Sequence, residues 1–266
     1  MDVFEQALKE KFGLSTRYVI GNTFAEISKL DRESVQIIVT SPPYAHLKDY
    51  GHPNQLGFGQ TYEEYQRDMR SVWFACEKVL EHGCRLAINV GDVFQRATNA
   101  SPYQILPLAA DTITSCRVAG LLYLGSIIWH HITTTKTTGG GKWMGSTYYP
   151  GEGMVTYEHE YILIFKRLGK RKTPTSPEIR ESSRLTRQQR SEWFRGVWTF
   201  PGVKQGKAGR IAAFPEELPE RLIRMFTYVG ETVLDPFVGS GTTCKVAERV
   251  GRNSIGIDLI PFWSKE

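Results

Sequence analysis

The sequence predicts an α/β fold built on a mostly parallel sheet with helices on both faces. Short apolar segments rich in Val and Ile alternate along the chain with longer segments of helical periodicity. The chain has 266 residues, of which 41% are hydrophobic, so it is long enough to bury a large core. No internal repeat is visible in the sequence, and we therefore expect one globular body that carries an insertion.

The first half of the chain supplies three of the expected helices. An amphipathic helix is predicted over residues 2–12, and strands are predicted over 17–21 and 35–40. Thr61 and Glu64 have the spacing of a capping box, which predicts a helix from there to about Leu80. The other elements expected in this half are a strand over 84–90, a helix from about Pro102 to Val118 and a strand over 122–130.

The second half continues the alternation of strands and helices. Strands are predicted over 157–167, 232–235 and 254–258. Helices are predicted within 214–230 and from Thr242 onward. Because helices separate most successive strands, most of the strands are expected to run parallel.

A basic segment with few apolar residues interrupts this pattern. Residues 166–195 contain ten Lys or Arg and three Glu, a charge of +7, whereas the whole chain carries +5. The rest of the chain is therefore close to neutral. Pro174 and Pro177 predict a mobile loop, which a short arginine-rich helix follows. Such a concentration of basic charge is typical of a nucleic-acid contact, and a solvated loop that aids solubility is the alternative.

Cysteine usage and hydropathy limit the expected cellular setting. The four cysteines have no disulfide-framework spacing and no charged-then-apolar leader opens the chain, so we expect a reduced, cytoplasmic protein. No stretch reaches the ~18 apolar residues of a membrane span, and we expect no membrane partner. Cys76, His82 and Cys84 fit no common zinc spacing, so we expect no metal.

The segment TSPPY, from Thr40 to Tyr44, directly follows the apolar run VQIIV. Two consecutive prolines fix the backbone and remove two donors, so the chain can leave a sheet at this point. Taken alone, the segment is explained by this structural role. A functional role requires a second site at the same edge of the sheet.

The segment LDPFVGSGTT supplies a second candidate site. A strand that ends in Asp235, followed by Gly239, Gly241 and a helix, lets a ligand lie against backbone N–H groups at the helix N-terminus. The spacing departs from G-x-G-x-x-G, which disfavours a dinucleotide. Asp258, at the tip of the next strand, is placed to bind ribose hydroxyls. Acidic residues at both strand tips favour a ligand site over a purely structural turn.

The two motifs together resemble those of the exocyclic-amino DNA methyltransferases. That family has a (D/N/S)PP(Y/F/W) catalytic motif and a DPF.GSGTT loop for S-adenosyl-L-methionine, and both are present here nearly letter for letter. The catalytic motif comes first and the basic segment lies between the two, as in the permuted beta group. The resemblance covers nearly the whole chain. It implies a Rossmann-like, circularly permuted methyltransferase fold with a mostly parallel seven-stranded sheet.

The resemblance also implies how the chain is divided and what it binds. Residues 1–165 would form the catalytic part, 166–210 a basic target-recognition insertion, and 211–266 the cofactor-binding part of the same domain. The expected partner is double-stranded DNA with a base flipped out of the helix. A restriction-modification role, with a cognate restriction endonuclease, is the family expectation. In most members of the family a helix follows the strand that ends in the ribose-binding acid, but only eight residues follow Asp258 here. Helix 2–12 is expected to cover the sheet face that this missing helix would leave exposed. The alternative is that helix 2–12 is a loose N-terminal appendage.

The chemistry of an exocyclic amine explains the catalytic motif. The nitrogen lone pair is drawn into the base ring, so two acceptors that hold the amine protons would turn the lone pair toward the methyl donor. The Ser41 hydroxyl and the Pro42 carbonyl can act as these acceptors, with Pro43 fixing the turn. Tyr44 provides a ring face for stacking on the flipped base.

The other candidate residues follow from their positions in the motifs. Asn89 and Asp92 are expected in the pocket, and Asp92 is either a proton acceptor or a residue that caps a loop. The residues expected to bind S-adenosyl-L-methionine are Asp235, Phe237, Gly239, Gly241, Thr242, Asp258, Phe214, Pro215 and, less directly, Asn22. The residues expected to bind DNA are Lys170, Arg171, Lys172, Arg184, Arg187 and Arg190.

Ser41 bears on which base is methylated. The serine form of the motif is similar to that of N4-cytosine enzymes, whereas N6-adenine enzymes more often carry Asp or Asn. The prediction is therefore a cytosine-N4 DNA methyltransferase, with N6-adenine as the alternative. An RNA methyltransferase and a DNA-binding protein that no longer transfers methyl are further alternatives. C5-cytosine chemistry needs a Pro-Cys pair, which the sequence lacks.

Overall fold

The computed structural model describes residues 11–45, 49, 51–95, 97, 102–130, 158–203 and 214–261. Its main sheet is formed by β1 (Thr16–Ile20), β2 (Val35–Thr40), β3 (Leu80–Val90), β6 (Leu121–His130), β7 (His159–Arg167), β8 (Val197–Thr199), β9 (Thr232–Asp235) and β10 (Asn253–Asp258). A separate hairpin is formed by β4 (Val93–Gln95) and β5 (Gln104–Leu106). The helices are α2 (Thr23–Ile27), α3 (Tyr62–Val79), α4 (Leu108–Val118), α5 (Pro177–Ser182), α6 (Arg187–Trp193), α7 (Glu217–Phe226) and α8 (Thr242–Arg249).

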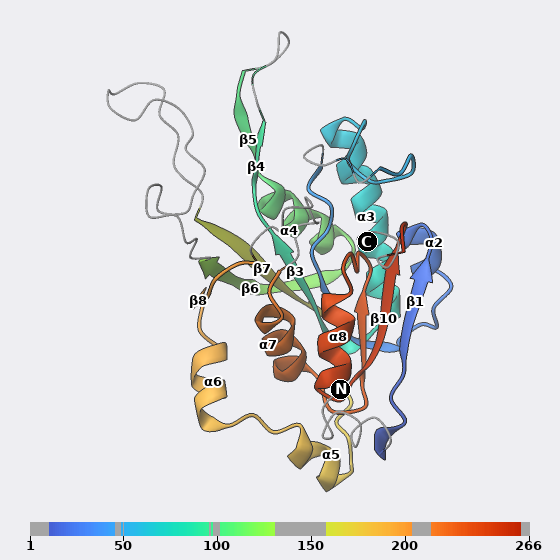
Figure 1. Ribbon diagram of the computed structural model, residues 1–266, viewed down its shortest axis with the longest axis vertical. Coiled ribbons are helices and arrows are strands. Elements are labelled where there is room, and N and C mark those ends of the chain that lie inside the picture. Colours follow the sequence, from blue (N-terminus) through green and yellow to red (C-terminus); the bar gives the residue numbers. More distant parts are fainter. Residues whose placement is uncertain are drawn as a thin grey trace.

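The main sheet has eight strands in the order β1-β10-β9-β2-β3-β7-β6-β8 (Figure 1). The first five strands in this order, β1, β10, β9, β2 and β3, are parallel to one another. β7 is antiparallel to both of its neighbours, and β8 is parallel to β6. The predicted mostly parallel α/β fold is therefore confirmed. The predicted number of seven strands is wrong for this sheet, because β8 is a three-residue strand inside the basic insertion.

Helices cover both faces of the sheet, because alternate residues of each central strand face opposite sides. On one face, Ile38 of β2 and Leu86 of β3 lie in a buried cluster with residues of α3 and α4. On the other face, Ile37 and Ala87 lie in a second cluster with residues of α7 and α8. The central strands are apolar on both sides, as the near-continuous run VQIIV predicts.

The hairpin of β4 and β5 is a difference from the sequence prediction. The helix expected from Pro102 to Val118 begins only at Leu108. Residues Gln104–Leu106 instead pair with Val93–Gln95 in an antiparallel ladder. The physical reason is Pro107, since a residue that precedes proline is restricted to extended conformations.

Two predictions for the N-terminal region have different outcomes. The capping box before α3 is confirmed. The Thr61 N–H donates to the Glu64 carboxylate over 2.8 Å, and the Glu64 N–H donates to the Thr61 hydroxyl over 3.2 Å. The predicted helix 2–12 lies almost wholly outside the described residues, so its place against the sheet stays a prediction. Within the described ranges, no helix is long and apolar enough to cross a membrane.

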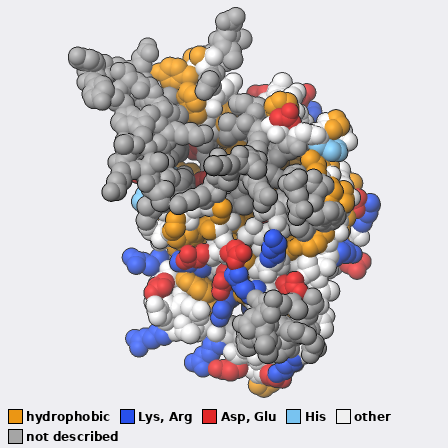
Figure 2. All heavy atoms as spheres, viewed as in Figure 1, with side chains coloured by type: hydrophobic (Ala, Val, Ile, Leu, Met, Phe, Trp, Pro, Cys, Tyr) orange, Lys and Arg blue, Asp and Glu red, His pale blue; other side chains and the backbone are white. Residues whose placement is uncertain are grey.

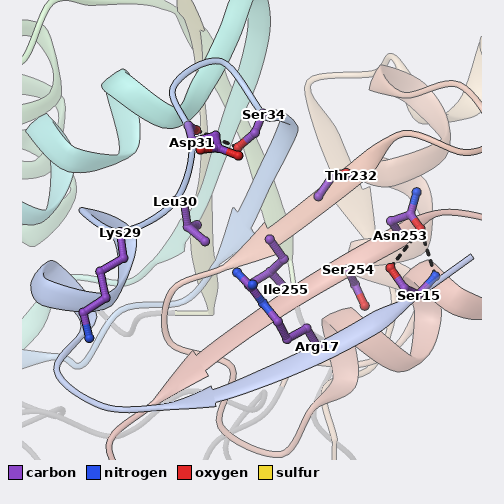
Figure 3. A pocket seen from close by; sticks show the side chains of 10 residues that line it. All are labelled: Ser15, Arg17, Lys29, Leu30, Asp31, Ser34, Thr232, Asn253, Ser254 and Ile255. Carbon is purple, nitrogen blue, oxygen red and sulfur yellow. Dashed lines mark hydrogen bonds between the residues drawn. The ribbon is translucent and has the colours of Figure 1, made fainter.

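A polar hollow lies where β1 and β10 begin, beside the segment that follows α2 (Figure 3). It has a volume of about 470 Å³, and Arg17, Lys29 and Asp31 contribute charged side chains to its lining. One wall is held together by a hydrogen bond of 2.9 Å from the Ser15 backbone N–H to Asn253 Oδ1. The hollow is at the amino ends of these strands and contains none of the predicted site residues.

The described part of the basic insertion contains more secondary structure than the single short helix predicted. Lys166 and Arg167 belong to β7, so the sheet includes the first residues of the range 166–210. Further along the insertion, α5 lies at the end of the molecule opposite the β4–β5 hairpin (Figure 1). The chain then passes through α6 and enters the sheet as β8, which pairs with residues Ile128–His130 at the end of β6. The insertion therefore runs from the amino-end edge of the parallel strands to their carboxyl-end edge.

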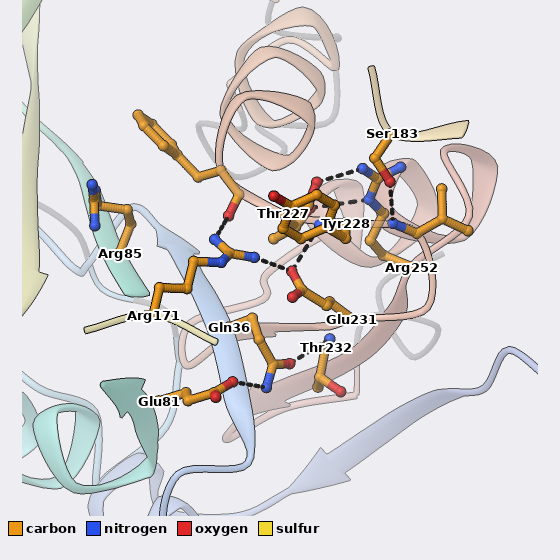
Figure 4. A network of polar contacts seen from close by, with 12 residues as sticks. Gln36, Glu81, Arg85, Arg171, Ser183, Thr227, Tyr228, Glu231, Thr232 and Arg252 are labelled. Carbon is orange, nitrogen blue, oxygen red and sulfur yellow. Dashed lines mark hydrogen bonds and ion pairs between the residues drawn. The ribbon is translucent and has the colours of Figure 1, made fainter. Parts of the chain in front are cut away.

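Arg171 fixes the start of this insertion to the sheet. Its guanidinium forms an ion pair with Glu231, donates to the Phe226 carbonyl and lies over the Tyr228 ring at 5.1 Å (Figure 4). A Cβ on Gly83 would lie 2.3 Å from the Arg171 nitrogen, so the two backbones touch at the start of β3. These contacts are structural.

Replacing Arg171 by Met would leave the partly buried Glu231 carboxylate without its charged partner. We expect the free energy of unfolding, measured by urea denaturation, to fall by about 2 kcal/mol. The matched control is Lys170→Met at the exposed neighbouring position, for which a change below about 0.5 kcal/mol is expected. Equal effects of the two substitutions would show that Arg171 does not anchor the insertion.

Candidate active site

Three neighbouring strands bring the two sequence motifs to one edge of the sheet. β2 ends at Thr40, β9 ends at Asp235 and β10 ends at Asp258, and the strands are adjacent in the order β10-β9-β2. Because the three strands are parallel, their carboxyl ends lie side by side. Ligands of open α/β sheets bind at this edge.

The buried carboxylate of Asp235 joins the two motifs directly. Thr40 Oγ1, which precedes the SPPY turn, donates to Asp235 Oδ1 over 2.8 Å. Thr243 Oγ1, in the first turn of α8, donates to Asp235 Oδ2 over 2.6 Å, and the Phe237 backbone N–H donates to Oδ1 over 3.1 Å. Burial raises the pKa of Asp235 to about 6, although these three donors oppose the rise.

The glycine-rich turn and Asp258 form the second part of the site. Gly239 and Gly241 have φ values of +52° and +82°, which glycine adopts without strain. The Gly239 N–H donates to Asp258 Oδ2 over 2.9 Å, and the Ile260 N–H donates to Oδ1 over 3.1 Å. Each carboxylate oxygen thus keeps a lone pair for a ligand hydroxyl. The first N–H groups of α8 are free of helical partners, as at any helix start.

Four other residues predicted to contact the cofactor lie at or before the starts of helices. Asn22 caps α2 and follows Gly21, whose N–H donates to the Asp258 carbonyl over 2.9 Å, so it lies beside the second part of the site. Thr242 opens α8, where its hydroxyl lies 3.0 Å from that of Ser240. Phe214 packs against the core beneath α7 and α8, and Pro215 precedes α7.

The SPPY turn is held by contacts from two other elements. Tyr65 of α3 donates its hydroxyl to the Pro43 carbonyl over 2.7 Å, so α3 fixes the backbone of the turn. Ser41 Oγ lies 3.5 Å from the Tyr44 hydroxyl, and that hydroxyl donates to Glu160 Oε2 over 3.2 Å. Burial raises the pKa of Tyr44 well above its usual range, and the Glu160 charge adds to the rise.

Glu160 is a site residue that the sequence reasoning missed. It stands near the start of β7, and its Oε2 also accepts a hydrogen bond from Asn89 Nδ2 over 2.5 Å. Asn89, predicted to lie in the pocket, is thereby placed next to the SPPY turn. The sequence does contain one indication of this role. Glu160 stands at the start of the apolar segment EYILIF, and an acidic residue beside a buried strand needs a partner.

Asp92 has a different environment from the other predicted catalytic residues. Its Oδ1 accepts from the Ala109 backbone N–H over 3.0 Å, at the start of α4. A carboxylate in this place satisfies a free N–H group and interacts favourably with the helix dipole. The geometry therefore matches the capping alternative for Asp92, and the carboxylate that accepts from Tyr44 of the SPPY turn is Glu160.

The six basic residues predicted to contact DNA are not brought together at this edge. Lys170, Arg171 and Lys172 lie at the opposite edge, and Arg171 is engaged with Glu231. Arg184, Arg187 and Arg190 are exposed. Figure 2 shows Lys and Arg side chains on the lower part of this face, mixed with Asp and Glu. The surface there is therefore not uniformly basic.

The cysteines take no part in the site's chemistry. All four are buried free thiols. Burial raises the pKa of Cys84 to about 11 and that of Cys244 to about 12, so these thiols stay neutral near pH 7. In the part of the chain that the structure describes, no group of three or more His, Cys, Asp or Glu is arranged to hold a metal ion.

Comparison with known proteins agrees with this geometry. Residues 35–263 match the DNA methylase family of N6 and N4 type. The Type II methyltransferase M.MjaI of Methanocaldococcus jannaschii is 31% identical over 265 residues, which cover 89% of this chain and 86% of that protein.

Solved structures extend the comparison. The Thermus thermophilus protein TTHA0409, provisionally described as a DNA modification methylase, was solved with S-adenosyl-L-methionine. It is 35% identical and aligns with a TM-score of 0.75 over 94% of this chain and 90% of its own. The cytosine-N4-specific PvuII DNA methyltransferase has a TM-score of 0.67 over 93% of this chain and 83% of its own, at 19% identity, which shows a shared fold.

The fold and the two joined motifs define an S-adenosyl-L-methionine-dependent methyltransferase. The chain belongs to the N6/N4 DNA methylase family. The family prediction and the predicted cofactor are thereby confirmed. The residues present fit that cofactor, because Asp258 has free lone pairs for ribose hydroxyls and the start of α8 offers N–H groups for a carboxylate.

The raised pKa of Asp235 predicts a specific dependence of stability on pH. The folded state holds this proton more tightly than the unfolded state, whose pKa is near 3.8. The stability gained from protonation is complete below pH 3.8 and is lost as the pH rises through about 6, a change on the order of 3 kcal/mol. The stability of Asp235→Asn relative to the parent should therefore increase between pH 4.5 and 7.5 in urea denaturation. Asp31→Asn, on an exposed loop, is the control, and a difference for Asp235→Asn that stays constant across this range would contradict the assignment.

Proposed function

We propose that the protein methylates the exocyclic N4 of cytosine in duplex DNA. The observation that carries this proposal is Ser41, whose hydroxyl follows the end of β2, lies 3.5 Å from the Tyr44 hydroxyl and is joined through Thr40 to the cofactor loop. The serine form of the motif supports cytosine over adenine. Adenine N6 is the competing target for the same arrangement.

The proposed catalytic work of the chain is to position the amine. The Ser41 hydroxyl and the Pro42 carbonyl would each accept one amine proton, which turns the nitrogen lone pair out of the base plane. Pro43 holds the turn, since Tyr65 binds its carbonyl. The Tyr44 ring would stack on the flipped base, a contact that adds about 1–3 kcal/mol for aromatic residues.

Cofactor binding is proposed for the neighbouring strand ends. Bound S-adenosyl-L-methionine supplies an electrophilic methyl group on a sulfonium sulfur. Asp258 would hold the ribose hydroxyls, with Asn22 beside it. Asp235 would hold the loop in shape through its three hydrogen bonds. The other residues proposed to line this part are Phe237, Gly239, Gly241 and Thr242, with Phe214 and Pro215 at the entry to α7.

DNA contacts are proposed for the second part of the insertion. Between Ser183 and β8 the chain runs toward the catalytic edge, and Arg187 and Arg190 of α6 are exposed along this path. Lys170 and Lys172 are exposed at the opposite edge and would meet only DNA that wraps around the protein. The names of the relatives as Type II methyltransferases support a restriction-modification role with a cognate endonuclease as a partner.

Identifying the methylated nucleoside tests the target base. Duplex DNA of varied sequence and, in a parallel reaction, RNA are incubated with the protein and S-adenosyl-L-methionine labelled in the methyl group. The digested nucleosides are then separated by mass. We expect labelled N4-methylcytosine, and Ser41→Ala should lower the rate about 100-fold because one amine acceptor is lost. Asn22→Ala, which removes a side chain near the cofactor, is a comparison that should affect cofactor affinity instead. Labelled N6-methyladenine would overturn the cytosine assignment, and label in RNA alone would overturn DNA as the substrate.

A further inference from the structure

The carboxylate of Glu160 ends a chain of hydroxyl groups that starts at the predicted catalytic serine. Ser41 Oγ, the Tyr44 hydroxyl and Glu160 Oε2 follow one another at 3.5 and 3.2 Å. Ser41 and Tyr44 belong to the same turn after β2, whereas Glu160 is far away in the sequence. Glu160 meets them because β7 lies next to β3, and β3 next to β2. This chain points from the proposed target amine into the protein.

The packing around Glu160 is specific for this arrangement. A Cβ added to Gly91 would lie 3.2 Å from Glu160 Cγ and 3.7 Å from Tyr44 Cε2. A side chain at position 91 would therefore press on Glu160 and contact Tyr44. The glycine directly after β3 leaves the space in which Tyr44 and Glu160 meet.

The direction of the hydrogen bonds follows from the chemistry of the end group. An ionised carboxylate only accepts, so the Tyr44 hydroxyl must donate to Glu160. The Tyr44 oxygen is then free to accept the Ser41 proton, and the Ser41 lone pairs face the other way. The raised pKa of Tyr44 keeps its hydroxyl protonated and thus able to donate. A serine whose proton is committed in this way acts as an acceptor toward an amine.

Asn89 reinforces the same carboxylate. Its Nδ2 donates to Glu160 Oε2, so its amide orientation is fixed. Its Oδ1 is buried and has no hydrogen-bond partner among the described residues. An unpaired buried acceptor is unusual in a folded protein, and a ligand donor in this pocket would pair with it.

We propose that Glu160 is a positioning residue that commits Ser41 as an acceptor and receives, through Tyr44, the proton that the methylated amine must lose. In this relay the amine N–H bond breaks and a Ser41 O–H bond forms, while the original Ser41 proton passes to the Tyr44 oxygen. The original Tyr44 proton passes to the Glu160 carboxylate. The amine loses its positive charge, Glu160 loses its negative charge, and both hydroxyl groups are restored. The proposal rests on the proposed function only in placing Ser41 at the amine, and it holds equally for cytosine and adenine.

The relay is tested by single-turnover methyl transfer with Glu160→Gln, Tyr44→Phe and the double variant. Gln has the shape of Glu but does not take the proton, and Phe keeps the ring for stacking. We expect each single variant to be slower by about 100-fold, the lower range for proton transfer by a side chain. The double variant should be no slower than the slower single variant, since both interrupt one chain. Glu158→Gln, two residues away and partly exposed beside His130, is the matched control and should keep the parent rate.

Two further measurements separate the relay from a merely structural role. Affinities for S-adenosyl-L-methionine and for DNA, measured by calorimetry and fluorescence anisotropy, should stay within threefold of the parent for Glu160→Gln. Formate should partly restore the rate of Glu160→Ala and leave Glu158→Ala unchanged. A Glu160→Gln rate within threefold of the parent, fully multiplicative losses in the double variant, or no rescue by formate would each overturn the proposal. Finding methyladenine instead of methylcytosine would overturn the target base and leave this result unaffected.

Discussion

The site depends on one buried carboxylate that lies between the catalytic and the cofactor motifs. Asp235 accepts from Thr40 at the end of β2 and from Thr243 in α8, residues that are far apart in the sequence. Burying a charged carboxylate is unfavourable, as the raised pKa of Asp235 indicates, and three hydrogen bonds offset that cost. The result is that the SPPY turn and the glycine loop have a fixed relative position before any ligand binds, which is the preorganisation that a methyl transfer requires.

The charges at this edge suit the ligands of a methyltransferase. Asp258 acts on Asp235, since its negative charge contributes to the raised pKa of Asp235. Two carboxylates at neighbouring strand ends favour a cationic ligand, and a sulfonium centre is such a ligand. The third carboxylate, Glu160, lies on the other side of the SPPY turn and contacts Tyr44. In the proposed function, the cofactor side of this edge is at β9 and β10 and the base side is at β2, β3 and β7.

Much of this arrangement could be predicted from the sequence, because its signals are local. A strand end is indicated within a few residues by the apolar runs of β2 and β9, by the proline pair and by the glycine turn. The role of Glu160 and that of Arg171 could not be predicted in the same way, because both depend on partners from distant segments. The same holds for β8, whose three residues form a strand only because the end of β6 is available for pairing. The sequence shows the basic composition of the insertion, but composition does not indicate which edge of the sheet each residue reaches.

The central claim, that Asp235 couples the two motifs, is tested most directly by the affinity of Thr40→Val for S-adenosyl-L-methionine. Thr40 belongs to the catalytic strand, and valine keeps its shape while removing the hydrogen bond to Asp235. Isothermal titration calorimetry should show weaker binding by about 10- to 100-fold, as expected for one lost hydrogen bond to a charged group. Thr112→Val, at a buried threonine of α4, should bind as the parent does. Unchanged affinity of Thr40→Val, in a variant that folds as the parent does, would contradict the coupling.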